Sequence, residues 1–201
     1  MINKKIALPT RQKCGHTGSQ PQTNAKLPMA KFCINRQPGW RAIIWAGVIA
    51  GALATLVQVL LWLIFTDDFP AILFRDARLT AALVLGGSVL PPPATFNAGI
   101  MLAATLVHFA LSIAYAALLA PLTLRLGLTA RLGGVSVFLA GAGFGVVLYM
   151  VNLYGFTAIF PWFAQARSWI ALVAHGVFGV TVISGYRCLH IRNARSQPDE
   201  H

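Results

Sequence analysis

Long apolar segments without charges alternate along the chain with short polar segments. The apolar segments cover about 43–65, 98–120, 135–160 and 169–189, and they are uncharged until Arg187 near the end of the last one. A helix rises about 1.5 Å per residue, so about 20 apolar residues cross the ~30 Å hydrocarbon core of a bilayer. The pattern therefore predicts an all-α, integral membrane four-helix bundle.

The polar segment between the first two spans, residues 67–93, contains a shorter apolar stretch. Asp67 or Asp68 could cap a helix that Pro70 starts, and the three prolines at 91–93 should end it. Its fully apolar part is too short to cross a bilayer, which favours an interfacial or re-entrant helix in the first outer loop. A fifth span is the alternative, and it would move the later basic loop to the outer side.

Charge is scarce in this chain and unevenly distributed. Only 10% of the residues are charged and 57% are hydrophobic, against roughly 25% charged in ordinary soluble proteins. Residues 1–41 hold eight Lys or Arg and no acid, and the remainder holds eight basic and five acidic residues, so that +8 and +3 give the net +11. Because Lys and Arg collect on the cytoplasmic side of short loops, the pattern predicts a bacterial inner-membrane protein with both termini in the cytoplasm.

The same distribution divides the chain into three parts. Residues 1–40 are expected to be a basic, disordered cytoplasmic tail, 41–190 the transmembrane domain and 191–201 a second tail. The tail has no apolar region typical of a cleavable signal peptide, and Met29 is an alternative start to Met1. Since the basic residues flank apolar spans and form no helical stripe, the expected partner is the lipid bilayer and not nucleic acid.

Small residues predict how the spans pack. Lipid tails are as apolar as leucine, so helices in a membrane associate through close backbone contact at small residues. The first span contains a GxxxG pair at Gly47 and Gly51, and the third contains another at Gly141 and Gly145. Both pairs are interpreted as helix-packing positions.

Four polar side chains lie inside the spans, one in each: Gln58, His108, Asn152 and His175. Counted at 1.5 Å per residue, all four lie ~9–15 Å below the outer boundary, close to one level. One interpretation is that they bond one another and fix the bundle. The other is that they line a small polar site, because ionisable residues at this depth are often functional.

Several chemistries lack their motifs. The sequence has no phosphate loop, GxSxG elbow or HExxH, its three cysteines have no metal-binding spacing, and its spans contain no Asp or Glu. We therefore expect no enzymatic activity, no cofactor and no metal. The alternative is a haem or metal ion held by His108 and His175, for which two histidines on adjacent helices would suffice.

The C-terminal half resembles small bacterial inner-membrane proteins of the YagU type. The resemblance is carried by residues 105–120, 139–161 and 174–179, and in particular by His108 with Ser112 and Tyr115, Gly141 to Gly145, and His175 with Gly176. The chain departs from that family in its basic N-terminus and its first outer loop. The resemblance implies a multi-span inner-membrane protein and no particular activity.

Two functional hypotheses follow. The first is a non-enzymatic multi-pass protein with a structural or envelope-stress role, built around the cluster of Gln58, His108, Asn152 and His175. The second is a small transporter or channel component of the sodium-linked solute symporter type, which with four spans would work as a homo-oligomer.

Overall fold

The computed structural model describes residues 39–125 and 133–195, with the side chains of the last helix described through Cys188. The chain divides into two units, Met1–Asn35 and Arg36–His201, and all described residues belong to the second. The predicted N-terminal tail and the alternative start at Met29 therefore lie outside the described residues.

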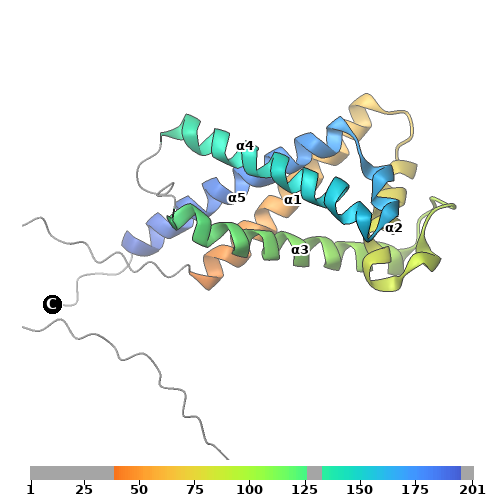
Figure 1. Cartoon of the computed structure of the whole chain (residues 1–201), viewed down its shortest axis with the longest axis horizontal. Helices are drawn as coiled ribbons and strands as arrows, with labels where there is room; N and C mark the ends of the chain where they lie inside the picture. The colour runs from red at the N-terminus through yellow and green to blue at the C-terminus, as the bar shows by residue number, and fades with distance from the viewer. Residues whose placement is uncertain (1–38, 126–132, 196–201) are drawn as a thin grey trace, which may run out of the picture. The chain divides into compact units, whose positions relative to one another are not determined.

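The described residues are mostly helical, with no β-strand among them (Figure 1), which confirms the predicted all-α fold. Three short segments connect the fourth and fifth helices. The helices are α1 (Trp40–Phe65), α2 (Ala71–Leu85), α3 (Ala98–Arg125), α4 (Gly134–Met150) and α5 (Trp169–Arg195), with η1 at Gly87–Val89, the π-helix η2 at Val151–Gly155, η3 at Phe156–Ala158 and η4 at Pro161–Ala166.

Four helices are long and apolar enough to cross a bilayer. The candidate spans are Trp40–Phe65, Ala98–Thr123, Gly134–Ala158 and Trp169–Cys188. Large apolar side chains on these helices are exposed, for example Leu102 and Val147 at 62% and 58%. Exposed apolar surface of this extent suits contact with lipid, so the chain is a multi-pass membrane-spanning protein.

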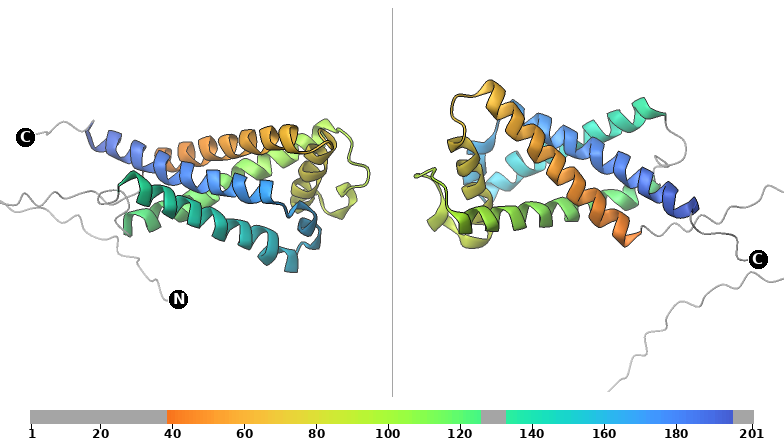
Figure 2. Two further views of the ribbon diagram at one scale, coloured as in Figure 1. Left: turned by 90° about the horizontal axis from the view of Figure 1, so that it is seen from above. Right: turned by 180° about the vertical axis from the view of Figure 1, so that it is seen from behind.

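The helices do not pack in sequence order. α4 packs against α5, α5 against α1, α1 against α3 and α3 against α2 (Figures 1 and 2). Within the described residues, α3 and α4 share no interface of comparable extent. The beginning of α1 and the end of α5 lie at one end of this arrangement, and α2 lies at the other (Figure 1).

Both glycine pairs lie at helix contacts. A Cβ at Gly47 would come within 2.8 Å of the Cα of Ile113 on α3, and one at Gly141 within 2.5 Å of the Cα of Val180 on α5. Cβ atoms in real structures do not approach backbone so closely. The helices can therefore meet at these distances only because the positions lack side chains.

The loop between the first two spans differs in detail from the prediction. α2 begins after Pro70, and neither Asp67 nor Asp68 caps it with a side chain. It ends at Gly86, whose φ of +78° suits glycine, and so it stops before the prolines that were expected to end it. With only 15 residues, α2 is too short to span a bilayer.

The ends of the spans also differ from the prediction. α3 continues through Pro121 to Arg125, beyond the expected end at 120. α5 continues to Arg195, so the predicted tail at 191–201 begins as helix. The third span, expected as one helix to 160, changes at Met150 from an α-helix to a π-turn and then to 3₁₀ segments.

Candidate functional site

A partly open cavity of about 420 Å³ lies among the helices, and all four polar residues singled out in the spans line it. Volumes of this size are typical of small-molecule sites. Every helix of the bundle contributes to the wall, and so do the segments after α4. The polar lining residues are Thr55, Gln58, Asp76, Thr80, His108, Ser112, Tyr115, Asn152 and His175, and the remaining walls are leucine, alanine and phenylalanine.

Asn152 links three elements of this cavity. It lies in the π-turn that follows α4, where the chain leaves regular α geometry, and π-turns are frequent at functional positions. Its Oδ1 accepts a hydrogen bond from the Tyr115 hydroxyl at 2.5 Å. Its Nδ2 lies 3.3 Å from Nε2 of His175. One amide thus joins α3 and α5.

The hydrogen bonds of His175 define its tautomer. Its Nδ1 lies 2.7 Å from the carbonyl oxygen of Ala171, and because a carbonyl only accepts, Nδ1 carries the hydrogen. Nε2 is then the acceptor for Asn152. The chain Tyr115 → Asn152 → His175 → Ala171 is therefore directional, and it uses both nitrogens of the imidazole.

His108 belongs to a separate contact between α1 and α3. Its Nε2 lies 3.3 Å from the carbonyl oxygen of Gly51 and 3.1 Å from Oγ1 of Thr55. Since the carbonyl needs a donor, the hydrogen is assigned to Nε2 and shared between the two oxygens. The four predicted residues thus share a cavity, but the hydrogen bond of Asn152 with His175 does not extend to His108 or Gln58.

Two lining residues retain unused hydrogen-bonding capacity. The amide of Gln58 forms no hydrogen bond with any described residue, although it lines the cavity. The Ser112 hydroxyl also has no partner among the described residues, although the residue is only 4% exposed. A Cβ at Gly51 would lie 2.6 Å from this hydroxyl oxygen, so the glycine leaves room beside it.

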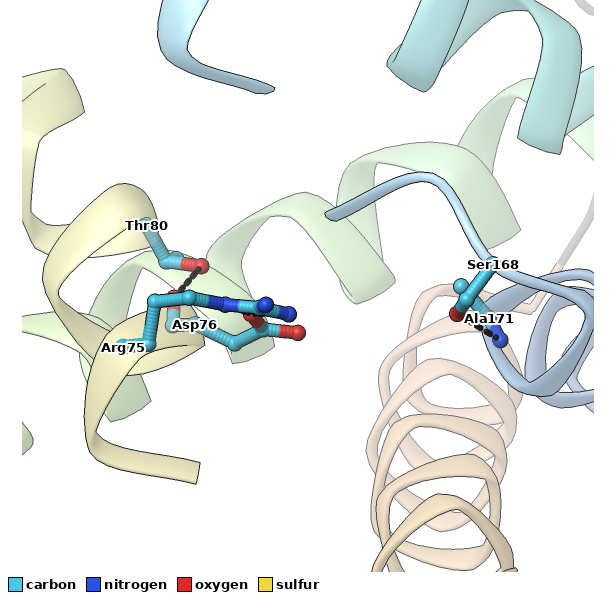
Figure 3. Close-up of polar contacts among 5 residues, drawn as sticks. All are labelled: Arg75, Asp76, Thr80, Ser168 and Ala171. Carbon is cyan, nitrogen blue, oxygen red and sulfur yellow. Dashed lines mark hydrogen bonds and ion pairs between the residues drawn. The ribbon is translucent and has the colours of Figure 1, made fainter. Parts of the chain in front are cut away.

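A carboxylate also lines the cavity, although the candidate spans themselves contain no Asp or Glu. Asp76 comes from α2, with its side chain 17% exposed and 2.7 Å from the Arg75 guanidinium (Figure 3). Burial raises the pKa of the Asp76 carboxyl, and Arg75 opposes that rise. The Thr80 hydroxyl donates to the backbone carbonyl of Asp76 one turn earlier (Figure 3).

Side-chain hydrogen bonds fix the segments that surround the cavity. Ser168 accepts from the Ala171 amide at 3.1 Å and so caps α5 (Figure 3). Arg167 donates from Nε to the carbonyl of Leu153 at 2.8 Å and stacks 4.2 Å over the ring of Tyr154. Ser168 thus satisfies an amide in the first turn of α5, and Arg167 binds the π-turn through one carbonyl and one ring.

Both histidines that line the cavity are engaged in hydrogen bonds. Among the described residues, no group of three His, Cys, Asp or Glu side chains could hold a metal ion. Ligation through His175 would require loss of its hydrogen bond to Asn152 or to Ala171, because both of its nitrogens are engaged.

Asp76, Ser112 and Thr55 also line the cavity, although they were not predicted to share a site. Asp76 lies in the segment 67–93, for which the sequence is compatible with either an interfacial or a spanning helix. Ser112 follows His108 by four residues, one helical turn, and Thr55 lies four residues after Gly51. These spacings on one helical face were the available signal.

No family model, curated protein or solved structure matches the chain. The resemblance to proteins of the YagU type stays a prediction that rests on the residues quoted for it. The functional conclusion below rests on the cavity and its lining residues.

Proposed function

We propose that this chain is a small-molecule-binding protein of the bacterial inner membrane that takes part in solute transport. The observation that carries the proposal is the shared cavity of Gln58, His108, Asn152 and His175. A bundle that used these residues only for packing would have no need of a cavity, because membrane helices pack well through small residues alone.

The composition of the cavity supports binding over catalysis. Its walls are mainly apolar, with a few polar groups placed by different helices, as in most small-molecule sites. Among the described residues, His175 forms no hydrogen bond with a Ser, Thr or Cys side chain. His108 forms one, with Thr55, and shares it with the Gly51 carbonyl. We therefore place this chain among binding or transport proteins and not among enzymes.

The orientation proposed from the loop charges puts the cavity on the periplasmic side. Residues 1–41 hold eight basic side chains, so the beginning of α1 would lie in the cytoplasm. α2 would then lie at the periplasmic end, and its Asp76 lines the cavity. Alkaline phosphatase fused after Arg195 should be inactive, and the enzyme inserted at Gly86 should be active.

A structural role is the second candidate, and a specific observation favours it. The chain Tyr115 → Asn152 → His175 → Ala171 satisfies most of its own hydrogen bonds. Such bonds between membrane helices are each worth about 0.6–2 kcal/mol, enough to fix how the helices meet. In that case the cavity would remain without a specific ligand.

A thermal-shift panel of uncharged solutes on the detergent-purified full chain distinguishes the two candidates. A ligand at 100 times its Kd stabilises a protein by about 2.7 kcal/mol, which a melting curve resolves. We expect at least one solute to raise the Tm of the native chain and of Leu118→Trp, but not of Leu111→Trp. Leu111 lines the cavity, whereas Leu118 on the same helix is 68% exposed.

The solutes that pass this test are then offered to proteoliposomes. Uptake that Leu111→Trp abolishes would establish transport. Equal shifts in both variants, or no shift with any solute, would show that the cavity binds nothing specific and would leave the structural role.

A further inference from the structure

The polar groups of the cavity that remain unsatisfied determine which ligand it suits, provided that the chain is the small-molecule-binding protein proposed above. Ser112 is 4% exposed, lines the cavity and has no hydrogen-bond partner among the described residues. Its hydroxyl oxygen keeps some accessible surface, so a ligand atom in the cavity can supply the hydrogen bond that it lacks.

Two amides add to this capacity. Asn152 uses one N–H for His175 and keeps the second, because an amide nitrogen carries two hydrogens. Gln58 has both N–H groups unused among the described residues. Together with Ser112, these groups offer hydrogens from α1, α3 and the π-turn. Ser112 and Gln58 can also accept, so an acceptor on the ligand is the partner that all three groups can bond.

The charge of the lining residues indicates that this acceptor is neutral. Asp76 is the acidic lining residue, and the Arg75 guanidinium lies 2.7 Å from it. No described Lys or Arg lines the cavity. A charged ligand would lose its hydration without gaining an opposite charge, which is strongly unfavourable.

The remaining walls indicate an apolar body. Phe156, Phe160, Phe163 and Phe178 line the cavity with several leucines, and aromatic rings favour edge-to-face or stacked contact with other rings. A volume of about 420 Å³ accommodates a fused two-ring compound.

We propose that the cavity binds a neutral, mainly apolar molecule with a carbonyl group, which accepts hydrogen bonds from Ser112, Asn152 and Gln58. Quinones and aryl ketones belong to this class. The proposal concerns binding only and involves no electron transfer.

Calorimetric titration of the full chain in lipid nanodiscs tests the proposal with three probes of similar shape, after subtraction of empty nanodiscs. The probes are 1,4-naphthoquinone, naphthalene, which lacks the carbonyls, and 1-naphthoate, which carries a charge. We expect naphthoquinone to bind at least about five-fold more tightly than naphthalene, since one or two hydrogen bonds are worth about that factor. The carboxylate should bind more weakly than either.

Ser112→Ala should weaken naphthoquinone binding by about three- to ten-fold and leave naphthalene binding unchanged. Ser184→Ala, at an exposed position of α5 outside the cavity lining, is the matched control and should change neither. If Ser112→Ala does not assemble, Gln58→Leu provides the same comparison. A 2-dodecyl-naphthoquinone that binds would identify the bilayer as the source of the ligand, and its exclusion would identify the aqueous side.

The outcomes distinguish failure of the carbonyl proposal from failure of the proposed binding function. Equal affinity for naphthoquinone and naphthalene, or an equal effect of Ser112→Ala on both, would overturn the carbonyl proposal while cavity binding stands. Failure of all three probes while solutes of the thermal-shift panel still bind would also overturn it alone. Failure of the probes and of the whole panel would overturn the proposed function itself.

Discussion

The side-chain amide of Asn152 donates to Nε2 of His175 across 3.3 Å. This hydrogen bond connects the π-turn after α4 to the second turn of α5, and Tyr115 extends it to α3. Because α3 and α4 share no extensive interface among the described residues, the amide contributes to holding these elements around the cavity.

Asn152→Leu should lower the free energy of unfolding by about 1–3 kcal/mol, because two interhelical hydrogen bonds are lost and each is worth about 0.6–2 kcal/mol. Denaturation by SDS in mixed micelles measures the change. In a double-mutant cycle with Tyr115→Phe, the two effects should be less than additive, since both remove the bond between them. Full additivity would show that the bond contributes nothing.

Gly145→Ala should destabilise the bundle by about 1–3 kcal/mol, the usual effect of overpacking. A Cβ at Gly145 would lie 2.6 Å from the Cα of Gly176, so α4 and α5 would have to separate. Gly143→Ala is the matched control, because a Cβ there meets nothing within 4 Å. It should be neutral or stabilise by up to about 1 kcal/mol through helix propensity. Similar losses in both variants would contradict the packing described here.

Arg78→Met should release the loop between α2 and α3 without unfolding the spans. Arg78 donates to the carbonyls of Val89 and Thr95, each at 3.2 Å, and one methionine cannot replace these bonds. Limited proteolysis should therefore cleave residues 86–97 faster in this variant. Arg75→Met, which removes an arginine on the same helix, should leave the cleavage rate near that of the native chain.

The stability of the full chain should depend on pH through Asp76. Burial raises the pKa of its carboxyl in the folded state above the ordinary 3.8, so folding favours the protonated form. This stabilising contribution is complete below 3.8 and is lost as the pH rises through the raised pKa. The difference in Tm between Asp76→Asn and the native chain should therefore grow from low to neutral pH. A constant difference would show that Asp76 does not titrate in this way.

The four spans could be predicted because each is marked by a long uncharged segment whose meaning does not depend on its neighbours. The same holds for the level of the polar residues, since depth follows from the rise of a helix. Gln58, His108, Asn152 and His175 accordingly line one cavity. Which of them bond one another depends on helix rotation and packing order, and neither the span lengths nor the helical rise contains that information.

The details that escaped prediction depend on tertiary contacts. The π-turn at Val151–Gly155 is stabilised by Arg167, which bonds the carbonyl of Leu153 from outside the span. Asp76 lines the cavity because α2 packs against α3 and because Trp162 donates to the carbonyl of Leu79. The hydrophobic periodicity within either segment does not indicate these contacts with residues far away in the sequence.

The packing order also constrains how the protein is made. α1 leaves the ribosome first, yet one of its principal partners is α5, which leaves last. The alanines that α1 buries, from Ala42 to Ala54, pack in one core with Phe178, Val182 and Tyr186 of α5. During synthesis this alanine face must therefore remain against lipid or the insertion machinery until the final span enters the bilayer. A nascent chain that ends before Trp169 would leave that face without its α5 partner.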